Sequence, residues 1–154
     1  MTLLRAGTGP FYGGGTVNTT HNIPRITSTL MTWDIAMNDD YGMWDTAAKT
    51  RLTTPSWATL VRYGTSIQWN PDGGNQYRHV WTHKNGSQPH GRGSDQQNLN
   101  GAQHHTQTHW SAPLAVVGGT DYFSTVCYHN DVTSIQPIQN STAVWGCIVV
   151  LGTT

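Results

Sequence analysis

The stretch Gly64–Gly86 constrains the fold of this chain more than any other. Residues 66–69, SIQW, alternate polar and apolar side chains, which is the period of a half-buried strand. Residues 70–75, NPDGGN, are nearly all turn formers, and an extended pattern resumes over Tyr77–His83. Asn85-Gly86 then supplies the positive φ angles that a two-residue hairpin turn requires. This stretch therefore predicts antiparallel β structure.

The composition extends this prediction to the whole chain. Charged residues make up only 10% of the 154 residues, with eight Asp, no Glu, six Arg and two Lys. Helices are normally built with Glu, Lys, Ala and Leu, whereas the 23 Thr, 17 Gly and seven Trp found here suit strands and turns. A chain of this length can bury a core of its own. We therefore expect a single all-β domain.

Charge and hydropathy argue against two classes of partner. The formal net charge is zero with His neutral, which disfavours binding to nucleic acid or to an anionic membrane surface. No segment approaches the length of an apolar membrane span, and Met1–Arg5 lacks the apolar region of a signal peptide, so we expect synthesis in a cytoplasm. The charge-poor surface favours a component of an oligomer or lattice.

The first 25 residues differ in kind from the rest. Gly-rich segments at 6–10 and 13–15 surround Phe11-Tyr12, and strand or helix signals are few. Such a segment cannot bury enough surface to fold alone, so it is either a frayed terminus or an arm that becomes ordered on a neighbouring subunit. We interpret residues 1–25 as an extended arm. Its expected contact residues are Leu3, Leu4, Arg5, Phe11 and Tyr12.

Strand patterns fill the remaining residues, 26–154, which we assign to one sandwich domain. Roughly eight to ten strands with regularly spaced turn signals favour a β-sandwich or jelly roll. Thr46–Lys49 is the one plausible helical turn. Expected strands include Ile26–Trp33, Ile35–Met37, Arg51–Thr53, Trp57–Trp69, 103–110, Tyr122–His129 and Ala143–Leu151, of which the last is apolar enough to be buried on both faces.

Two of these segments have faces that the alternation assigns. In the longest strand, one face carries Val61, Tyr63, Thr65, Ile67 and Trp69, and the other carries Arg62, Gly64, Ser66 and Gln68. In Tyr77–His83, we expect Val80 and Thr82 to point inward and His79, Trp81 and His83 outward. An outward Trp flanked by His is typical of a contact surface, and the alternative is an ordinary, partly covered Trp.

The two cysteines and eight histidines carry little chemical signal. Cys127 and Cys147 lie in apolar runs and are expected to be buried, reduced thiols, although spacing alone leaves a disulfide open. His79 and His83, like His105 and His109, share a strand face but are roughly 13 Å apart at Cα, too far to chelate one ion. A threefold axis could gather three copies of one His, so an axial metal stays an alternative. We expect no metal and no other cofactor.

The acidic residues and the short motifs of the sequence do not indicate a calcium site or a catalytic site. Asp39, Asp40 and Asp45 lie in one loop, but their spacing matches no calcium loop, and carboxylates that cap turns are the favoured interpretation. There is no nucleophile elbow, no phosphate-cradling Gly loop, and no Glu for paired-carboxylate chemistry. We therefore expect a protein that is not an enzyme.

Six short motifs follow one another along the chain: 40–45 (DYGMWD), 51–55 (RLTTP), 66–69 (SIQW), 83–87 (HKNGS), 119–122 (GTDY) and 150–152 (VLG). Their order resembles the trimeric jelly-roll family of the complement globular head and tumour necrosis factor, most closely its bacteriophage virion members. The resemblance spans about residues 26–152. Two features depart from the family pattern: residues 58–60 lack the Gly that often precedes the long central strand, and residues 88–101 are unusually polar.

This resemblance implies a sandwich of about ten strands in two sheets that forms a homotrimer around a threefold axis. Arg62, Ser66 and Gln68 are then expected to face that axis, and His79, Trp81 and His83 to form an outer contact surface. The implied function is that of a capsid decoration, or cement, protein on the exterior of a phage virion, which bridges copies of the major capsid protein. The alternative is a receptor-binding knob of a tail or head fibre that recognises host glycans. A soluble signalling ligand is a third, less favoured class.

Overall fold

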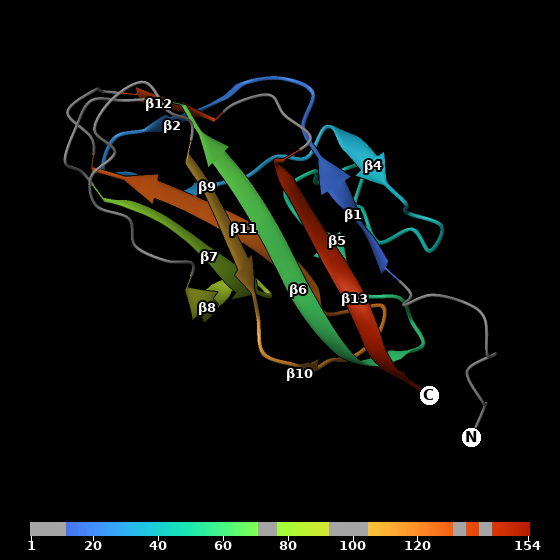
Figure 1. The fold of residues 1–154 in the computed structure, drawn as a ribbon. Coiled ribbons are helices and arrows are strands. Elements are labelled where there is room, and N and C mark those ends of the chain that lie inside the picture. Colours follow the sequence, from blue (N-terminus) through green and yellow to red (C-terminus); the bar gives the residue numbers. More distant parts are fainter. Residues whose placement is uncertain (1–11, 71–76, 93–104, 131–134, 139–142) are drawn as a thin grey trace.

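The computed structural model describes residues 12–70, 77–92, 105–130, 135–138 and 143–154, and these form two antiparallel sheets. Figure 1 shows the two sheets packed as the layers of a sandwich. The larger sheet has eight strands in the order β2-β12-β6-β13-β1-β4, with β9 and β10 also paired to β6; the smaller has the order β3-β11-β7-β8, with β5 paired to β11. The strands are β1 (Tyr12–Thr16), β2 (His21–Pro24), β3 (Thr29–Leu30), β4 (Ile35–Met37), β5 (Leu52–Thr53), β6 (Ala58–Trp69), β7 (Arg78–Lys84), β8 (Ser87–Arg92), β9 (His105–Trp110), β10 (Leu114–Ala115), β11 (Tyr122–His129), β12 (Ile135–Ile138) and β13 (Trp145–Thr153).

The prediction of an all-β jelly-roll sandwich is confirmed. The described residues contain thirteen strands, more than the roughly ten expected, because several are short edge pieces. The two long strands of the central stretch, β6 and β7, lie in opposite sheets. Their connection falls partly in residues 71–76, outside the described residues. Within the described part of the chain, no helix is long and apolar enough to cross a membrane.

The hairpin between β7 and β8 forms at the predicted dipeptide. Asn85 and Gly86 have φ angles of 53° and 74°, so both adopt the left-handed conformation that Asn and Gly tolerate best. The side-chain amide of Asn85 makes two further hydrogen bonds. Its Nδ2 donates to Asp121 Oδ1, and its Oδ1 accepts from the backbone N–H of Tyr122. The turn is thereby tied to the start of β11, which is the central strand of the smaller sheet.

The core lies between the two sheets and is built around the inward face of β6. Val61, Tyr63, Ile67 and Trp69 are fully buried there, as the alternation predicts. Each such side chain stabilises the fold by about 1.5–3 kcal/mol through removal of apolar surface from water. They pack with side chains from the other strands and loops, including Ile23, Met31, Trp33, Met43, Leu52, Phe123 and Ile148.

Three hydroxyl groups cross this core between the sheets. Tyr63 Oη lies 2.6 Å from Thr125 Oγ1, and Thr125 Oγ1 donates to Thr65 Oγ1 at 3.0 Å. Thr65 Oγ1 in turn donates to the carbonyl oxygen of Trp145. These hydrogen bonds hold β6 and β11 in one position relative to each other across the core. Because each buried hydroxyl has a partner, their burial carries no large desolvation penalty.

One local prediction differs from the structure. The expected strand Ile26–Trp33 is reduced to β3, because Ile26 has a φ of 56° in a turn and is 60% exposed. Thr46–Lys49 does form the expected single turn, which the Lys49 N–H closes by donating to the Asp45 carbonyl oxygen at 2.7 Å. Asp45 Oδ1 also accepts hydrogen bonds from the backbone N–H groups of residues 47 and 48, and Lys49, with a φ of 49°, ends the turn.

The second half of the predicted arm belongs to the larger sheet. β1 lies between β13 and β4, and β2 pairs with β12, so residues 12–24 are part of the sandwich and not of a separate arm. Glycine is required in β1 because a Cβ at Gly15 would lie 2.5 Å from the Cβ of Trp33, which packs against the strand. The other arm residues, Leu3, Leu4, Arg5 and Phe11, lie outside the described residues, so their role as contacts stays a prediction.

The two cysteines are free thiols, as expected. Cys127 lies on the inward face of β11, and Cys147 lies in β13 beside Gly64 of β6; both are buried. Burial raises the pKa of Cys127 and raises that of Cys147 to about 12, so both thiols are protonated at neutral pH. Cys127 serves as a small apolar core residue, whereas Cys147 lies on the outward side of β13 and is 6% exposed.

Candidate functional site

The outer face of the larger sheet is unusually apolar. The register places side chains in rows across β9, β6, β13, β1 and β4. One row is Thr108, Ser66, Trp145, Thr16 and Ile35; the next is Trp110, Gly64, Cys147, Gly14 and Met37. We call these rows, with Arg62 and Val149 beyond them, the large-sheet face.

Trp110 dominates the large-sheet face. Its ring lies over Gly64, where a Cβ would be 2.5 Å from Cζ3, so only glycine leaves room for the indole. Trp145 packs beside it with ring centroids 5.7 Å apart. The guanidinium carbon of Arg62 is 5.5 Å from the centroid of the Trp110 ring, and Arg62 Nε donates to the Ser111 carbonyl oxygen at 3.0 Å. Trp110 is still 39% exposed and Ile35 44% exposed.

The residues predicted to face a trimer axis all lie on this outward face of β6. Arg62 and Gln68 are partly exposed, whereas Ser66 is 3% exposed because its hydroxyl is 3.1 Å from that of Thr108 on β9. Gln68 Nε2 donates to Thr106 Oγ1 at 3.5 Å. The position of the three residues agrees with the prediction, while their place at an axis stays a prediction.

The outer face of the smaller sheet carries an aromatic cluster. His79, Trp81 and His83 point outward and Val80 and Thr82 inward, as the alternation predicts. His79 packs against Tyr77, Trp81 and Tyr128, with centroid distances of 6.1, 5.7 and 5.6 Å, and is therefore only 9% exposed. Trp81 and Tyr128 also contact each other at 6.2 Å.

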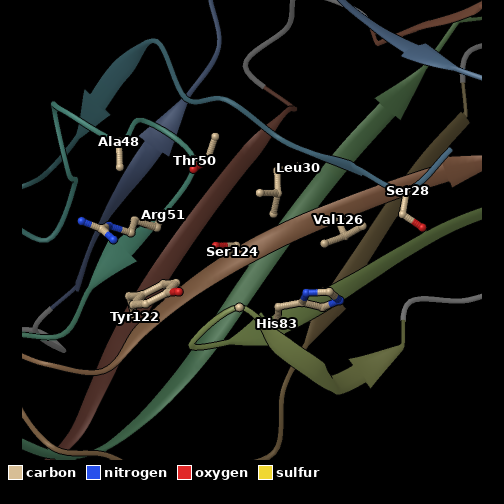
Figure 2. Close-up of a pocket in the computed structure, with 10 residues that line it drawn as sticks. Ser28, Leu30, Ala48, Thr50, Arg51, His83, Tyr122, Ser124 and Val126 are labelled. Carbon is tan, nitrogen blue, oxygen red and sulfur yellow. The ribbon is translucent and has the colours of Figure 1, made fainter.

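Beside the aromatic cluster lies a pocket of about 340 Å³. Figure 2 shows its side chains gathered over β11, which supplies Tyr122, Ser124 and Val126. Leu30 of β3 and His83 of β7 stand on either side, and Arg51 closes the end near Tyr122. Ser124 and Val126 are each 3% exposed and form the floor, whereas Leu30 is 46% exposed. The sequence signal for this pocket was limited to the outward His83.

Hydrogen bonds and ion pairs fix the polar groups of the pocket. Trp81 Nε1 donates to His83 Nε2 at 3.0 Å, an arrangement that fits the tautomer with its proton on Nδ1. Arg51 Nε donates to Asp45 Oδ2 at 2.6 Å, and its guanidinium carbon lies 5.1 Å from the centre of the Tyr122 ring. The backbone hydrogen bond from Ala48 and the hydrogen bond from Arg51 lower the pKa of Asp45, so this ion pair is intact at neutral pH.

The described part of the chain contains no cluster of side chains that could bind a metal ion. No three His, Cys or Asp side chains there gather closely enough to hold an ion. Asp39 accepts hydrogen bonds from the N–H groups of Met43 at 2.6 Å and Trp44 at 2.8 Å, which confirms that this carboxylate caps a turn. His105 and His109 point inward from β9, and their Nε2 atoms are buried without a partner.

Sequence reasoning missed the tryptophan pair on the large-sheet face. Trp110 and Trp145 lie far apart in sequence and meet only because β9 and β13 both pair with β6. The one signal that could have indicated the contact is Gly64, a glycine inside an otherwise regular strand, since such a glycine marks close approach of another group.

The two antiparallel sheets define this protein as an all-β jelly-roll sandwich. Among solved structures, the chain is similar to the one described as "Structure of Eiger TNF from S. frugiperda", with a TM-score of 0.55 and 11% sequence identity over 94% of each chain. At that identity the likeness concerns the fold alone. No protein-family model and no curated protein matches the sequence.

Proposed function

We propose that the chain is a homotrimeric structural protein of a virion, which decorates the exterior of a phage capsid. The observation that supports the homotrimer is the exposed, apolar large-sheet face, and the capsid role extends the resemblance of the sequence to virion proteins. Antiparallel sheets normally turn a polar face to water, whereas this one presents Trp110, Trp145, Ile35 and Val149. Exposed apolar patches of this kind mark protein contacts.

Two further copies of the same chain are the occupants that fit this face. Among the described residues of its rows, Arg62 is the one charged side chain, so a symmetric copy brings little charge repulsion. In a closed threefold ring the contact is heterologous, so the half of the face near β9 meets the half near β4 of the next subunit. Trp110 and Trp145 lie in or next to the first half, and Ile35 and Met37 in the second.

The oligomer is tested with two isoleucines of similar exposure. Ile35→Asp places a charge on the large-sheet face. Ile26→Asp places a charge at a turn outside the rows of that face, where Ile26 is 60% exposed. Light scattering coupled to size exclusion is expected to give a trimer for the parent and for Ile26→Asp and a monomer for Ile35→Asp. A monomeric parent at tens of micromolar would contradict the proposal.

Attachment to the capsid is assigned to the first eleven residues, with Leu3, Leu4, Arg5 and Phe11 as contacts and Tyr12 at the start of β1. Three arms on one trimer bind together, so weak single contacts give high avidity for the major capsid protein. Deletion of residues 1–11 is expected to leave the trimer intact and to abolish binding to expanded capsids prepared without this protein. Normal decoration by the truncated trimer would refute the role of the arm.

A second function is favoured by the pocket and the aromatic cluster of the smaller sheet. Aromatic side chains beside polar pocket groups suit a receptor-binding knob that recognises host glycans, with His79, Trp81 and His83 as its outer contact surface. Under this alternative the intact protein binds host cells and ignores capsids. Fluorescently labelled trimer mixed with cells and with expanded capsids separates the two functions.

A further inference from the structure

The pocket on the smaller sheet has the chemistry of a saccharide site. Its volume of about 340 Å³ lies at the lower end of the range of small-molecule sites and suits one sugar ring with its substituents. Val126 and Leu30 offer an apolar surface on which the carbon face of a sugar can lie. Ser124, His83 and Tyr122 place hydroxyl and imidazole groups around that surface (Figure 2).

The polar groups match hydroxyl groups, which both donate and accept hydrogen bonds. The hydroxyls of Ser124 and Tyr122 can each donate and accept. His83 lines the pocket with its imidazole, whose Nε2 accepts a hydrogen bond from Trp81 Nε1 at 3.0 Å. Trp81 therefore acts as a positioning residue that fixes the plane of the imidazole. A purely apolar ligand would strip water from these groups without replacing it.

The charges around the pocket argue for a neutral ligand. Arg51 is the cation that lines it, and Asp45 already holds the guanidinium through two nitrogens. Lys84, which precedes the hairpin near Tyr122, is likewise paired with Asp121 Oδ2 at 2.8 Å. An anionic ligand would have to break an existing ion pair to gain a new one.

We propose that the pocket bounded by Leu30, His83, Tyr122, Ser124 and Val126 binds one neutral saccharide residue. The site lies on the sheet opposite the large-sheet face, so one trimer presents three copies of it. The inference depends on neither capsid attachment nor the trimer. It also gives the glycan-recognising alternative a defined location.

The test uses saturation-transfer NMR of the full chain with glucose, galactose, mannose, rhamnose and N-acetylglucosamine, and with glucuronic acid as the acidic comparison. At least one neutral sugar is expected to give a signal. Leu30→Arg fills the pocket from an exposed position and is expected to abolish it. Val117→Arg, at a 65% exposed residue outside the pocket, is the matched control and is expected to bind as the parent does.

A second variant removes one hydrogen-bonding group without adding bulk. Ser124→Ala is expected to weaken binding about tenfold, in line with the loss of one hydrogen bond to a sugar hydroxyl. The proposal is overturned if no sugar of the panel gives a saturation-transfer signal and no glycan on an array is bound. It is also overturned if Leu30→Arg gives the same saturation-transfer signal as the parent. A signal from glucuronic acid alone overturns its neutral character. Size exclusion of each variant distinguishes these outcomes from failure of the trimer.

Discussion

The ring of Trp110 on β9 occupies the space that a side chain at Gly64 on β6 would fill. A Cβ at position 64 would lie 2.5 to 2.7 Å from three carbon atoms of the indole. The glycine and the tryptophan therefore form one unit, in which the missing side chain of the first allows the second to cover the sheet.

Gly64→Ala is expected to lower the free energy of unfolding by about 1–3 kcal/mol, because the methyl group must push the indole off the sheet. Trp110→Ala removes the ring that obstructs the methyl group. In a double-mutant cycle by urea denaturation, Gly64→Ala should therefore cost little in the Trp110→Ala background. If Gly64→Ala lowers the free energy of unfolding equally in the parent and in Trp110→Ala, the strain lies in the backbone and not in contact with the indole.

Asp39 is expected to stabilise its turn without calcium. Asp39→Ala removes the acceptor for the N–H groups of Met43 and Trp44 and should destabilise the fold by about 2 kcal/mol, the scale of hydrogen bonds to a charged group. Asp40→Ala, at the exposed neighbour, is the control and should change little. Thermal melts with calcium and with chelator should coincide. A calcium-dependent rise in Tm that Asp39→Ala abolishes would indicate a metal site.

The buried hydroxyl chain is expected to behave as a coupled unit. Thr125→Val removes the partner shared by Tyr63 and Thr65 and should cost about 1–3 kcal/mol, since the Tyr63 hydroxyl is left buried without that bond. Adding Tyr63→Phe removes the stranded hydroxyl, so the double variant should be more stable than Thr125→Val alone. Chemical denaturation measures both. A double variant less stable than the single one would rule out this coupling.

Stability is expected to fall in two steps as the pH is lowered. Burial lowers the pKa of His109, and burial together with the nearby Arg78 lowers that of His105, below the ordinary value of 6.5. The unfolded chain then binds more protons than the folded chain, so stability is full above about pH 6.5 and declines below it. Asp45 has a pKa below 3.8 in the folded state, so its contribution is present above that pH and lost further down.

The histidine step is checked by denaturation at pH 7.5, 6.5 and 5.5. In His105→Gln/His109→Gln the decline over this range should become shallower than in the parent. An unchanged slope would assign the proton uptake to other groups. The step near pH 3.8 should persist in this variant, because it belongs to the carboxylates.

Periodicity determined what could be predicted from the sequence. The faces of β6, β7 and β11 follow from strict alternation, and the hairpin follows from the backbone freedom of Asn85 and Gly86. β1 could not be predicted, because its three glycines carry no strand signal and pair with β13, which lies far away in the sequence. The pocket could not be predicted either, because Leu30, Arg51, His83 and Val126 come from segments that only the tertiary fold brings together.

The place of β13 has a consequence for the synthesis of the protein. This strand comes last in the sequence, yet it lies between β6 and β1 in the larger sheet (Figure 1). Until β13 has been synthesised, one edge of β6 and one edge of β1 have no neighbouring strand, although β6 can pair with β9 and β1 with β4. The larger sheet is therefore completed only when β13 inserts between two strands that are already in place, and this long-range pairing is expected to form late in folding.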